Sequence, residues 1–179
     1  MRDNRLPDIV KVAHLLLSQL RDIEVAVDMT VGNGHDTLFL AQHFPVVYGF
    51  DLQAAALAAA RQRLGQYQVT LICADHYEVQ RYISSADLFV FNLGWLPGSD
   101  KTIVTTAERT LPTLAKCREL LNPGGLLAIV CYNGDPLQQA ESLAVYNWLR
   151  AQPELVTQQL RVLNKPTAPV FYLAALQKN

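Results

Sequence analysis

Long apolar runs, most of them closed by a polar residue or a glycine turn, alternate along the chain with segments of helical periodicity. Continuous apolar runs of this length are typical of strands that have helices on both faces of the sheet. The last two expected strands have no helix between them, which indicates an antiparallel pair at the sheet edge. The expected strands cover residues 25–31, 46–50, 69–74, 88–92, 126–132, 155–163 and 170–176.

Amphipathic segments predict the helices between these strands. Pro112 marks a kink or a boundary within the fourth helix, Pro136 suits the first turn of the fifth, and the NPGG sequence at 122–125 predicts a turn. The alternation predicts an α/β fold, with a mostly parallel sheet between two layers of helices, in a single domain over residues 1–179. The expected helices cover residues 6–20, 35–43, 53–64, 102–121 and 136–151.

The composition fits one compact domain, since half of the 179 residues are hydrophobic. The 15 basic and 16 acidic residues nearly cancel, so a contact with RNA would need a local basic patch. No apolar run approaches the roughly 20 residues that span a bilayer, and the polar start lacks the layout of a secretory signal. We therefore expect a cytoplasmic protein with no membrane contact. The three widely spaced cysteines indicate neither a disulfide framework nor a metal site.

Polar groups follow the first three expected strands, and ligands of open parallel sheets bind at the carboxyl ends of the strands. Gly32-Asn33-Gly34 follows the first strand and opens a helix, so that backbone can approach a ligand closely and free N–H groups face it. Asp51 ends the second strand and can accept both hydrogen bonds of a ribose diol. Asp75 and His76 end the third strand, where an adenine edge could lie. These strand ends predict a nucleoside cofactor.

Two classes of enzyme share this arrangement. The dinucleotide fingerprint of NAD-dependent oxidoreductases needs a third glycine at position 37, where Thr37 stands. Asp28, four positions before Gly32, is similar to the cofactor motif of methyltransferases. S-adenosylmethionine is therefore favoured over NAD as the cofactor. A non-catalytic RNA-binding or scaffold protein with the same fold is a third class, which the near-neutral charge disfavours.

The fourth apolar strand ends in Asn92, followed by a turn that contains Trp95. Methyltransferases that act on nitrogen commonly have Asn or Asp at this point and an aromatic residue after it, so that a side-chain oxygen and a backbone carbonyl hold the amine. An alkylamine has a pKa of about 10, so its neutral form costs about 4 kcal/mol at pH 7. Two acceptors can then orient the lone pair, and no metal is needed.

Several longer stretches resemble one family over nearly the whole chain. They are DMTVGNGHDTLFLA, GFDLQ, ADH, FNLGWLPGSDK, LLNPGGLLAIVCY and the GDP that follows it. The family was long described as rRNA methylases and is now associated with the tRNA 5-aminomethyl-2-thiouridine methyltransferase of the wobble position. The resemblance implies a Rossmann-like class I methyltransferase, with a seven-stranded, mostly parallel sheet whose last strand is antiparallel. It also implies S-adenosylmethionine as cofactor and conversion of 5-aminomethyl-(2-thio)uridine in the anticodon arm of tRNA to 5-methylaminomethyl-(2-thio)uridine.

The resemblance, together with the motifs above, assigns roles to individual positions. Asn92 is the expected catalytic residue, and His14 also matches a position of the family. The residues expected at the cofactor are Asp28, Gly32, Asn33, Gly34, His35, Asp36, Thr37, Asp51, Gln53, Asp75 and His76. The residues expected at the substrate are Trp95, Gly98, Lys101 and Tyr132.

The chain departs from the family pattern at Asp135, because the family usually has Gly-His-Pro where this chain has Gly-Asp-Pro. The segment 164–171 before the last strand is also shorter than expected. An rRNA or a small-molecule amine stays open as the alternative substrate. A domain of this size offers little surface to an anticodon arm, which would favour a homodimer.

Overall fold

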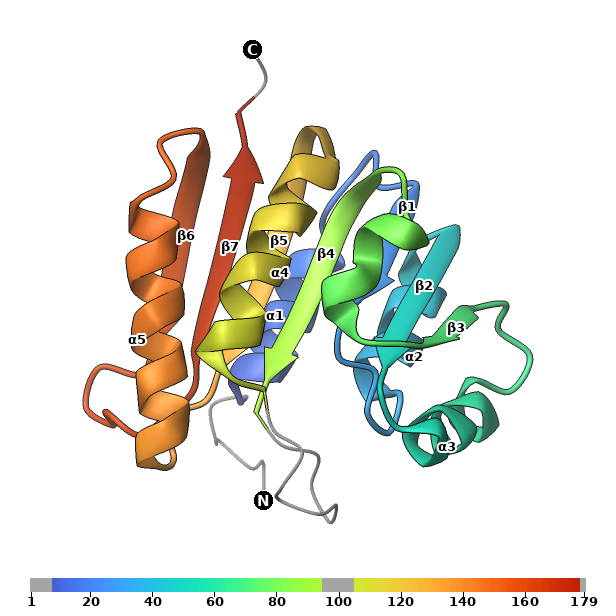
Figure 1. The fold of residues 1–179 in the computed structure, drawn as a ribbon, viewed down its shortest axis with the longest axis horizontal. Coiled ribbons are helices and arrows are strands. Elements are labelled where there is room, and N and C mark those ends of the chain that lie inside the picture. The colour runs from blue at the N-terminus through green and yellow to red at the C-terminus, as the bar shows by residue number, and fades with distance from the viewer. Residues whose placement is uncertain (1–7, 95–104, 178–179) are drawn as a thin grey trace, which may run out of the picture.

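The computed structural model describes residues 8–94 and 105–177. Seven strands form one sheet in the order β3-β2-β1-β4-β5-β7-β6 (Figure 1). The strands are β1 (Val25–Asp28), β2 (Val46–Asp51), β3 (Thr70–Cys73), β4 (Ala86–Leu93), β5 (Leu121–Cys131), β6 (Leu155–Arg161) and β7 (Val170–Leu176). The helices are α1 (Ile9–Leu17), α2 (His35–His43), α3 (Ala54–Leu64), the short 3-10 helix η1 (His76–Arg81), α4 (Ala107–Leu120) and α5 (Pro136–Arg150).

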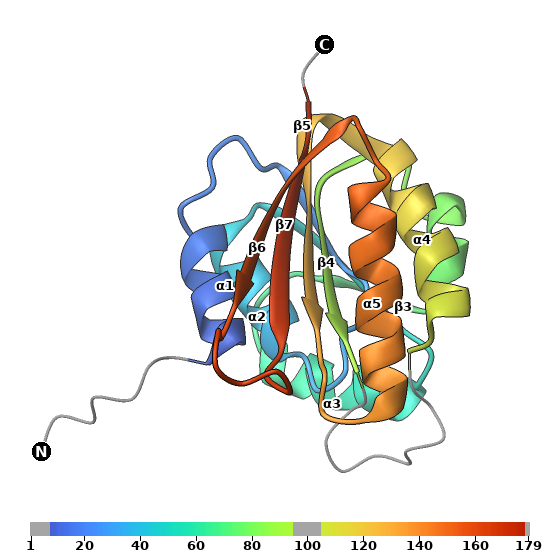
Figure 2. The same ribbon diagram turned by 90° about the vertical axis from the view of Figure 1, so that its left-hand side faces the viewer.

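The sheet is parallel from β3 through β5, and β7 pairs antiparallel with both β5 and β6. This confirms the predicted seven-stranded, mostly parallel sheet with an antiparallel last strand. Figure 2 shows α1 and α2 on one side of the sheet and α4 and α5 on the other. The two sides bury separate apolar clusters: one contains Leu17, Leu40 and Phe171, and the other contains Leu114 and Val145.

Two local expectations differ from the structure. Pro112, expected to mark a kink or a boundary, is not a boundary, because α4 continues through it from Ala107 to Leu120. A single missing N–H is tolerated in a helix that packs on η1 and α5. The NPGG sequence does not precede β5 but lies within it as a bulge. Ala86 pairs with Leu121 and Leu88 pairs with Leu126, so the four residues 122–125 of β5 lie opposite the single residue Asp87 of β4.

Strand order brings the four predicted strand ends together. The carboxyl ends of β3, β2, β1 and β4 are consecutive neighbours in the sheet, so Asp75, Asp51, the glycine turn and Asn92 follow one another along one edge. This confirms the predicted adjacency, which follows from parallel pairing. No helix in the described ranges 8–94 and 105–177 is long and apolar enough to cross a membrane.

Candidate functional site

The glycine turn after β1 is organised from inside by Asp28. This carboxylate is fully buried, accepts a hydrogen bond from the Thr30 amide at 3.0 Å and one from the Thr37 hydroxyl at 2.6 Å. Burial raises the pKa of Asp28 to about 7, and the negative charge of Asp36 adds to the rise. Both Asp28 and Thr37 were expected at the cofactor. Because both are completely buried, they shape the turn rather than line its surface.

Two positions of the turn require glycine, because a side chain would be unfavourable at either of them. Gly32 has φ +51° and Gly34 has φ +78°, both in the left-handed region. A Cβ on Gly34 would lie 2.8 Å from Ala60 Cα, so glycine lets α2 begin directly against α3. Between them, the Asn33 carbonyl accepts a hydrogen bond from Arg63 Nε at 2.7 Å. His35 and Asp36 then form the first turn of α2, where backbone N–H groups are free.

The Asp51 side chain joins the segment after β1 to the segment after β2. Its Oδ2 accepts the Gly32 amide at 2.8 Å and its Oδ1 accepts the Gln53 amide at 2.8 Å. A carboxylate has about four acceptor positions, so lone pairs remain for a ribose diol. The backbone therefore holds Asp51 in a fixed orientation before a ligand arrives.

The end of β3 is more occupied than expected. Asp75 Oδ1 accepts the Tyr77 amide at 2.9 Å, and Oδ2 forms an ion pair with Arg109 of α4. An adenine amino group would have to share this carboxylate with Arg109. His76 Nδ1 lies 3.3 Å from the Met29 carbonyl, while its buried Nε2 has no partner among the described residues. Burial lowers the pKa of His76, so the ring is neutral and offers an acceptor to a ligand.

Asp36, which was expected at the cofactor, connects α1 to β4. Its Oδ1 lies 2.8 Å from His14 Nε2, and its Oδ2 accepts the side-chain amide Nδ2 of Asn92 at 2.8 Å. The Asn92 backbone amide also donates to the Thr30 hydroxyl at 2.8 Å. Asn92 Oδ1 is buried and has no hydrogen-bond partner within residues 8–94 and 105–177. An unpaired buried acceptor at this point is suited to a ligand that donates.

Tyr132, predicted at the substrate, packs next to this group. Its ring covers Gly94, where an added Cβ would lie 3.0 Å from Tyr132 Cδ2. Burial raises the pKa of the Tyr132 phenol, the charge of Asp36 adds to this, and the neighbouring Asn92 side chain opposes it. The structure thus brings Tyr132 and Asn92 together. The other residues expected at the substrate, Trp95, Gly98 and Lys101, lie outside the described residues.

Sequence reasoning missed a buried acid on α5. Glu141 accepts the Thr110 hydroxyl at 2.6 Å and the Thr105 hydroxyl at 2.7 Å, and burial raises its pKa. It lies four residues before Val145 on the apolar face of α5, which is the one sequence signal that could have marked it. Asp135, which replaces the family histidine, caps α5 by accepting the Leu137 and Gln138 amides at 2.8 and 3.1 Å.

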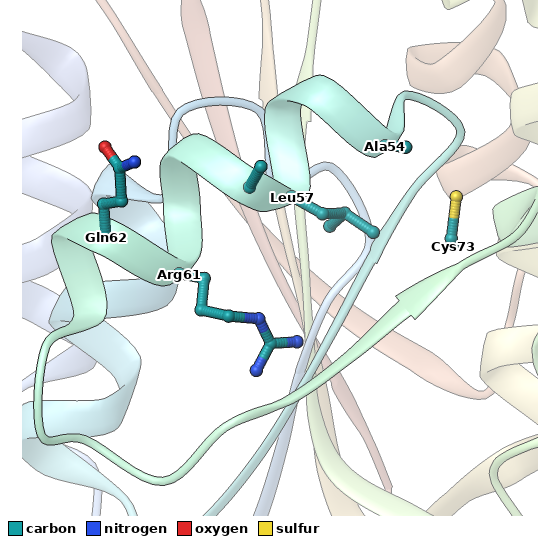
Figure 3. Close-up of a pocket in the computed structure, with 6 residues that line it drawn as sticks. Ala54, Leu57, Arg61, Gln62 and Cys73 are labelled. Atoms are coloured by element: carbon teal, nitrogen blue, oxygen red, sulfur yellow. The ribbon is translucent and has the colours of Figure 1, made fainter.

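A second concave surface adjoins the carboxyl end of β3. A pocket of about 520 Å³ opens between α3 and β3 and is lined by Leu57, Arg61 and Cys73 with their neighbours (Figure 3). None of the predicted site residues within 8–94 and 105–177 lines it. No group of His, Cys, Asp or Glu side chains in the described part of the chain is arranged to hold a metal ion.

The residues present fit a nucleoside cofactor with an amine acceptor beside it. Asp51 is fixed by two backbone amides and keeps acceptor positions free, the first turn of α2 has free amides, and His76 Nε2 is an unsatisfied buried acceptor. Asn92 Oδ1 is the second such acceptor, one strand further along the sheet. For reference below, the residues at the ends of β1, β2 and β3 are called the cofactor half, after their predicted role, and those at the end of β4 the acceptor half.

Comparisons with known proteins identify the family of the chain. The family described as "Putative rRNA methylase" matches residues 47–175. The tRNA (mnm5s2U34)-methyltransferase, chloroplastic, of Arabidopsis thaliana is 30% identical over 94% of this chain and 69% of that protein.

Two solved structures share the fold closely. A structure described as a putative rRNA-methylase from Clostridium thermocellum is 30% identical, with a TM-score of 0.87 over 96% of this chain and 98% of that one. A structure described as a putative methyltransferase from Streptococcus mutans, in complex with SAH, is 32% identical, with a TM-score of 0.86 over 96% of this chain and 99% of that one. These similarities overturn the NAD-dependent alternative. The chain belongs to the rRNA methylase family and is an S-adenosylmethionine-dependent methyltransferase.

Proposed function

We propose that the enzyme methylates the primary amine of 5-aminomethyl-(2-thio)uridine at the wobble position of tRNA, giving 5-methylaminomethyl-(2-thio)uridine. The observation that carries this proposal is the buried, unpaired Oδ1 of Asn92 at the end of β4. The Arabidopsis relative is named for a tRNA substrate, and its similarity over 94% of this chain supports the choice of RNA.

The residues of the acceptor half act by orientation. Asn92 Oδ1 would accept an N–H of the neutral amine and so direct the nitrogen lone pair away from itself. Tyr132 stays a neutral phenol at physiological pH because its pKa is raised, so it adds no charge beside the amine. The burial of Asn92 Oδ1 removes competing water from the acceptor.

The residues of the cofactor half hold the methyl donor. Asp51 would bind the ribose, Gly32-Asn33-Gly34 and the first turn of α2 would approach the rest of the nucleoside, and His76 would accept from the adenine edge. When bound, S-adenosylmethionine supplies a methyl group already activated on a sulfonium. The protein therefore needs to position and desolvate the amine rather than to generate a stronger electrophile.

The experiment is methylation of tRNA that carries 5-aminomethyl-2-thiouridine, with isotope-labelled S-adenosylmethionine and nucleoside mass spectrometry. We expect label in 5-methylaminomethyl-2-thiouridine. In tRNA from a strain that lacks the gene, the aminomethyl nucleoside should accumulate. If the tRNA nucleosides are unchanged and the label appears in rRNA or in a small amine, the tRNA substrate is contradicted and the alternative substrate is supported. A cytoplasmic location and a homodimer stay predictions. Cell fractionation tests the location, and light scattering tests the oligomeric state.

A further inference from the structure

Three side chains from three separate elements form one hydrogen-bonded chain beside the acceptor site. His14 of α1 contacts Asp36 of α2 at 2.8 Å, and Asp36 accepts the amide nitrogen of Asn92 of β4 at 2.8 Å. An ionised carboxylate only accepts, so His14 Nε2 must carry its hydrogen toward Asp36. The same reasoning makes Nδ2, not Oδ1, the Asn92 atom that faces the carboxylate.

The direction of the Asn92 amide decides whether the site can work. With Oδ1 toward the acceptor, the amide accepts an N–H of the amine and leaves the nitrogen lone pair free. With Nδ2 toward the acceptor, it would donate to that lone pair, which is the pair that must attack the methyl group. An asparagine alone can adopt either orientation by rotation of its amide, so another group must fix it.

The surroundings restrict the movement of these three hydrogen-bonded side chains. The His14 ring stacks on Phe39, with ring centres 4.0 Å apart and planes 3° from parallel. Asp36 lies in the first turn of α2, where the helix dipole favours a negative charge. The cavity bordered by His14, Asp36 and Asn92 has a volume of about 10 Å³, which leaves room for one water at most.

We propose that Asp36 and His14 are positioning residues, which hold the Asn92 amide with Oδ1 presented to the acceptor amine. This inference rests on the proposed function, because it assumes that Asn92 receives the amine. Asp36 therefore serves the acceptor half of the site, although it follows directly on the cofactor turn.

An exchange of the two side chains tests the direction of the bonds. In Asp36→Asn, the new amide oxygen accepts from His14 and the new NH2 group faces Asn92, so the Asn92 amide should rotate to present its oxygen to residue 36. We expect kcat to fall at least tenfold, while the Kd for SAH stays within twofold of wild type. The double variant Asp36→Asn with Asn92→Asp restores every donor and acceptor, and its kcat should exceed that of either single variant. A wild-type kcat in Asp36→Asn, or a double variant no better than the single ones, overturns the proposal. A loss of SAH affinity with an intact kcat would mean that Asp36 acts in cofactor binding, and would contradict the positioning role.

His14 gives a second route that does not disturb α2. His14→Gln keeps a donor that can reach Asp36, whereas His14→Ala removes it. We expect kcat to fall several-fold in His14→Ala and to recover in His14→Gln, with the KM for S-adenosylmethionine unchanged in both. His43→Ala is the matched control, because His43 also packs on Phe39, at 4.3 Å, but does not touch Asp36. Equal losses in His14→Ala and His43→Ala would reduce His14 to a packing role and contradict the proposal.

A measurement without substrate separates this inference from the proposed function. The Asn92 side-chain amide signal in a ¹⁵N-labelled protein, identified by its absence in Asn92→Ala, should show slow hydrogen exchange in wild type and fast exchange in Asp36→Asn. Equal exchange in both proteins refutes the positioning role. If the exchange changes as expected while no tRNA amine is methylated, the proposed substrate fails and the positioning of Asn92 stands.

Discussion

The amide of Gly32 donates to Asp51 Oδ2 at 2.8 Å, which ties the turn after β1 to the end of β2. Asp51→Ala removes this bond and the one from Gln53, and it also removes the expected ribose acceptor. We expect at least a tenfold rise in the Kd for SAH, measured by calorimetry, and a loss of about 1–3 kcal/mol in unfolding free energy. Asp51→Asn keeps an acceptor for one amide and should lie between Asp51→Ala and wild type. Unchanged affinity in Asp51→Ala would contradict the ribose assignment.

Asn92→Ala should abolish methyl transfer while the Kd for SAH stays near the wild-type value, because Asn92 belongs to the acceptor half of the site. Asn147→Ala, an exposed asparagine of α5, is the control and should keep full activity. The assay is turnover on tRNA together with SAH binding. Wild-type turnover in Asn92→Ala would remove its catalytic role.

Gly34→Ala should destabilise the protein through two effects. Gly34 has φ +78° and ψ +20°, in the left-handed α region, so an alanine there carries a backbone penalty of about 1–2 kcal/mol. Its Cβ would also lie 2.8 Å from Ala60, and overpacking adds about 1–3 kcal/mol. Urea unfolding measures the total loss. A loss no larger than the backbone penalty would mean that α2 and α3 separate easily at this contact.

The buried Asp28 predicts a pH dependence of stability. Its pKa is raised from 3.8 to about 7, so the folded protein binds a proton that the unfolded chain releases above pH 4. This contribution to the free energy of unfolding is fully present below pH 4 and is lost as the pH rises to about 7. Asp28→Asn keeps the shape without titrating, so its stability relative to wild type should increase between pH 5 and pH 8. Urea unfolding at both pH values gives the difference, and a constant difference would show that Asp28 titrates normally.

Glu141 should contribute to stability through its two threonine partners. Glu141→Ala leaves the Thr105 and Thr110 hydroxyls without their acceptor and opens a cavity, so we expect a loss of about 2–4 kcal/mol. Glu141→Gln keeps an acceptor and should lose less than half as much. Chemical unfolding of both variants provides the comparison. A Glu141→Ala variant as stable as Glu141→Gln would show that water replaces the carboxylate.

Sequence reasoning succeeded where local pattern determines structure. Parallel strands that follow one another through helices pair in a predictable order, so the neighbouring ends at Asp51, Asp75 and Asn92 could be foreseen. The limits of α2 were also predicted correctly, since Gly34 and Pro45 mark its two ends.

Other features depend on contacts that no local pattern encodes. His14 and Asn92 are 78 positions apart, and the hydrogen bonds that join them through Asp36 arise only when α1 docks on the sheet. The inward orientation of Asp28 and the burial of Glu141 likewise reflect packing, since an acidic residue usually predicts a surface position. The bulge at residues 122–125 looked like an ordinary turn because its composition is that of a turn.

The docking of α1 links an early part of the chain to a strand near its end. Ala13 and Leu17 of α1 pack in one cluster with Phe171 of β7, and this cluster also contains residues of β1, β4 and β5. Full burial of α1 therefore depends on the pairing of β7 with β5. Because His14 lies on α1, a substitution that loosens β7 should also weaken the contact of His14 with Asp36.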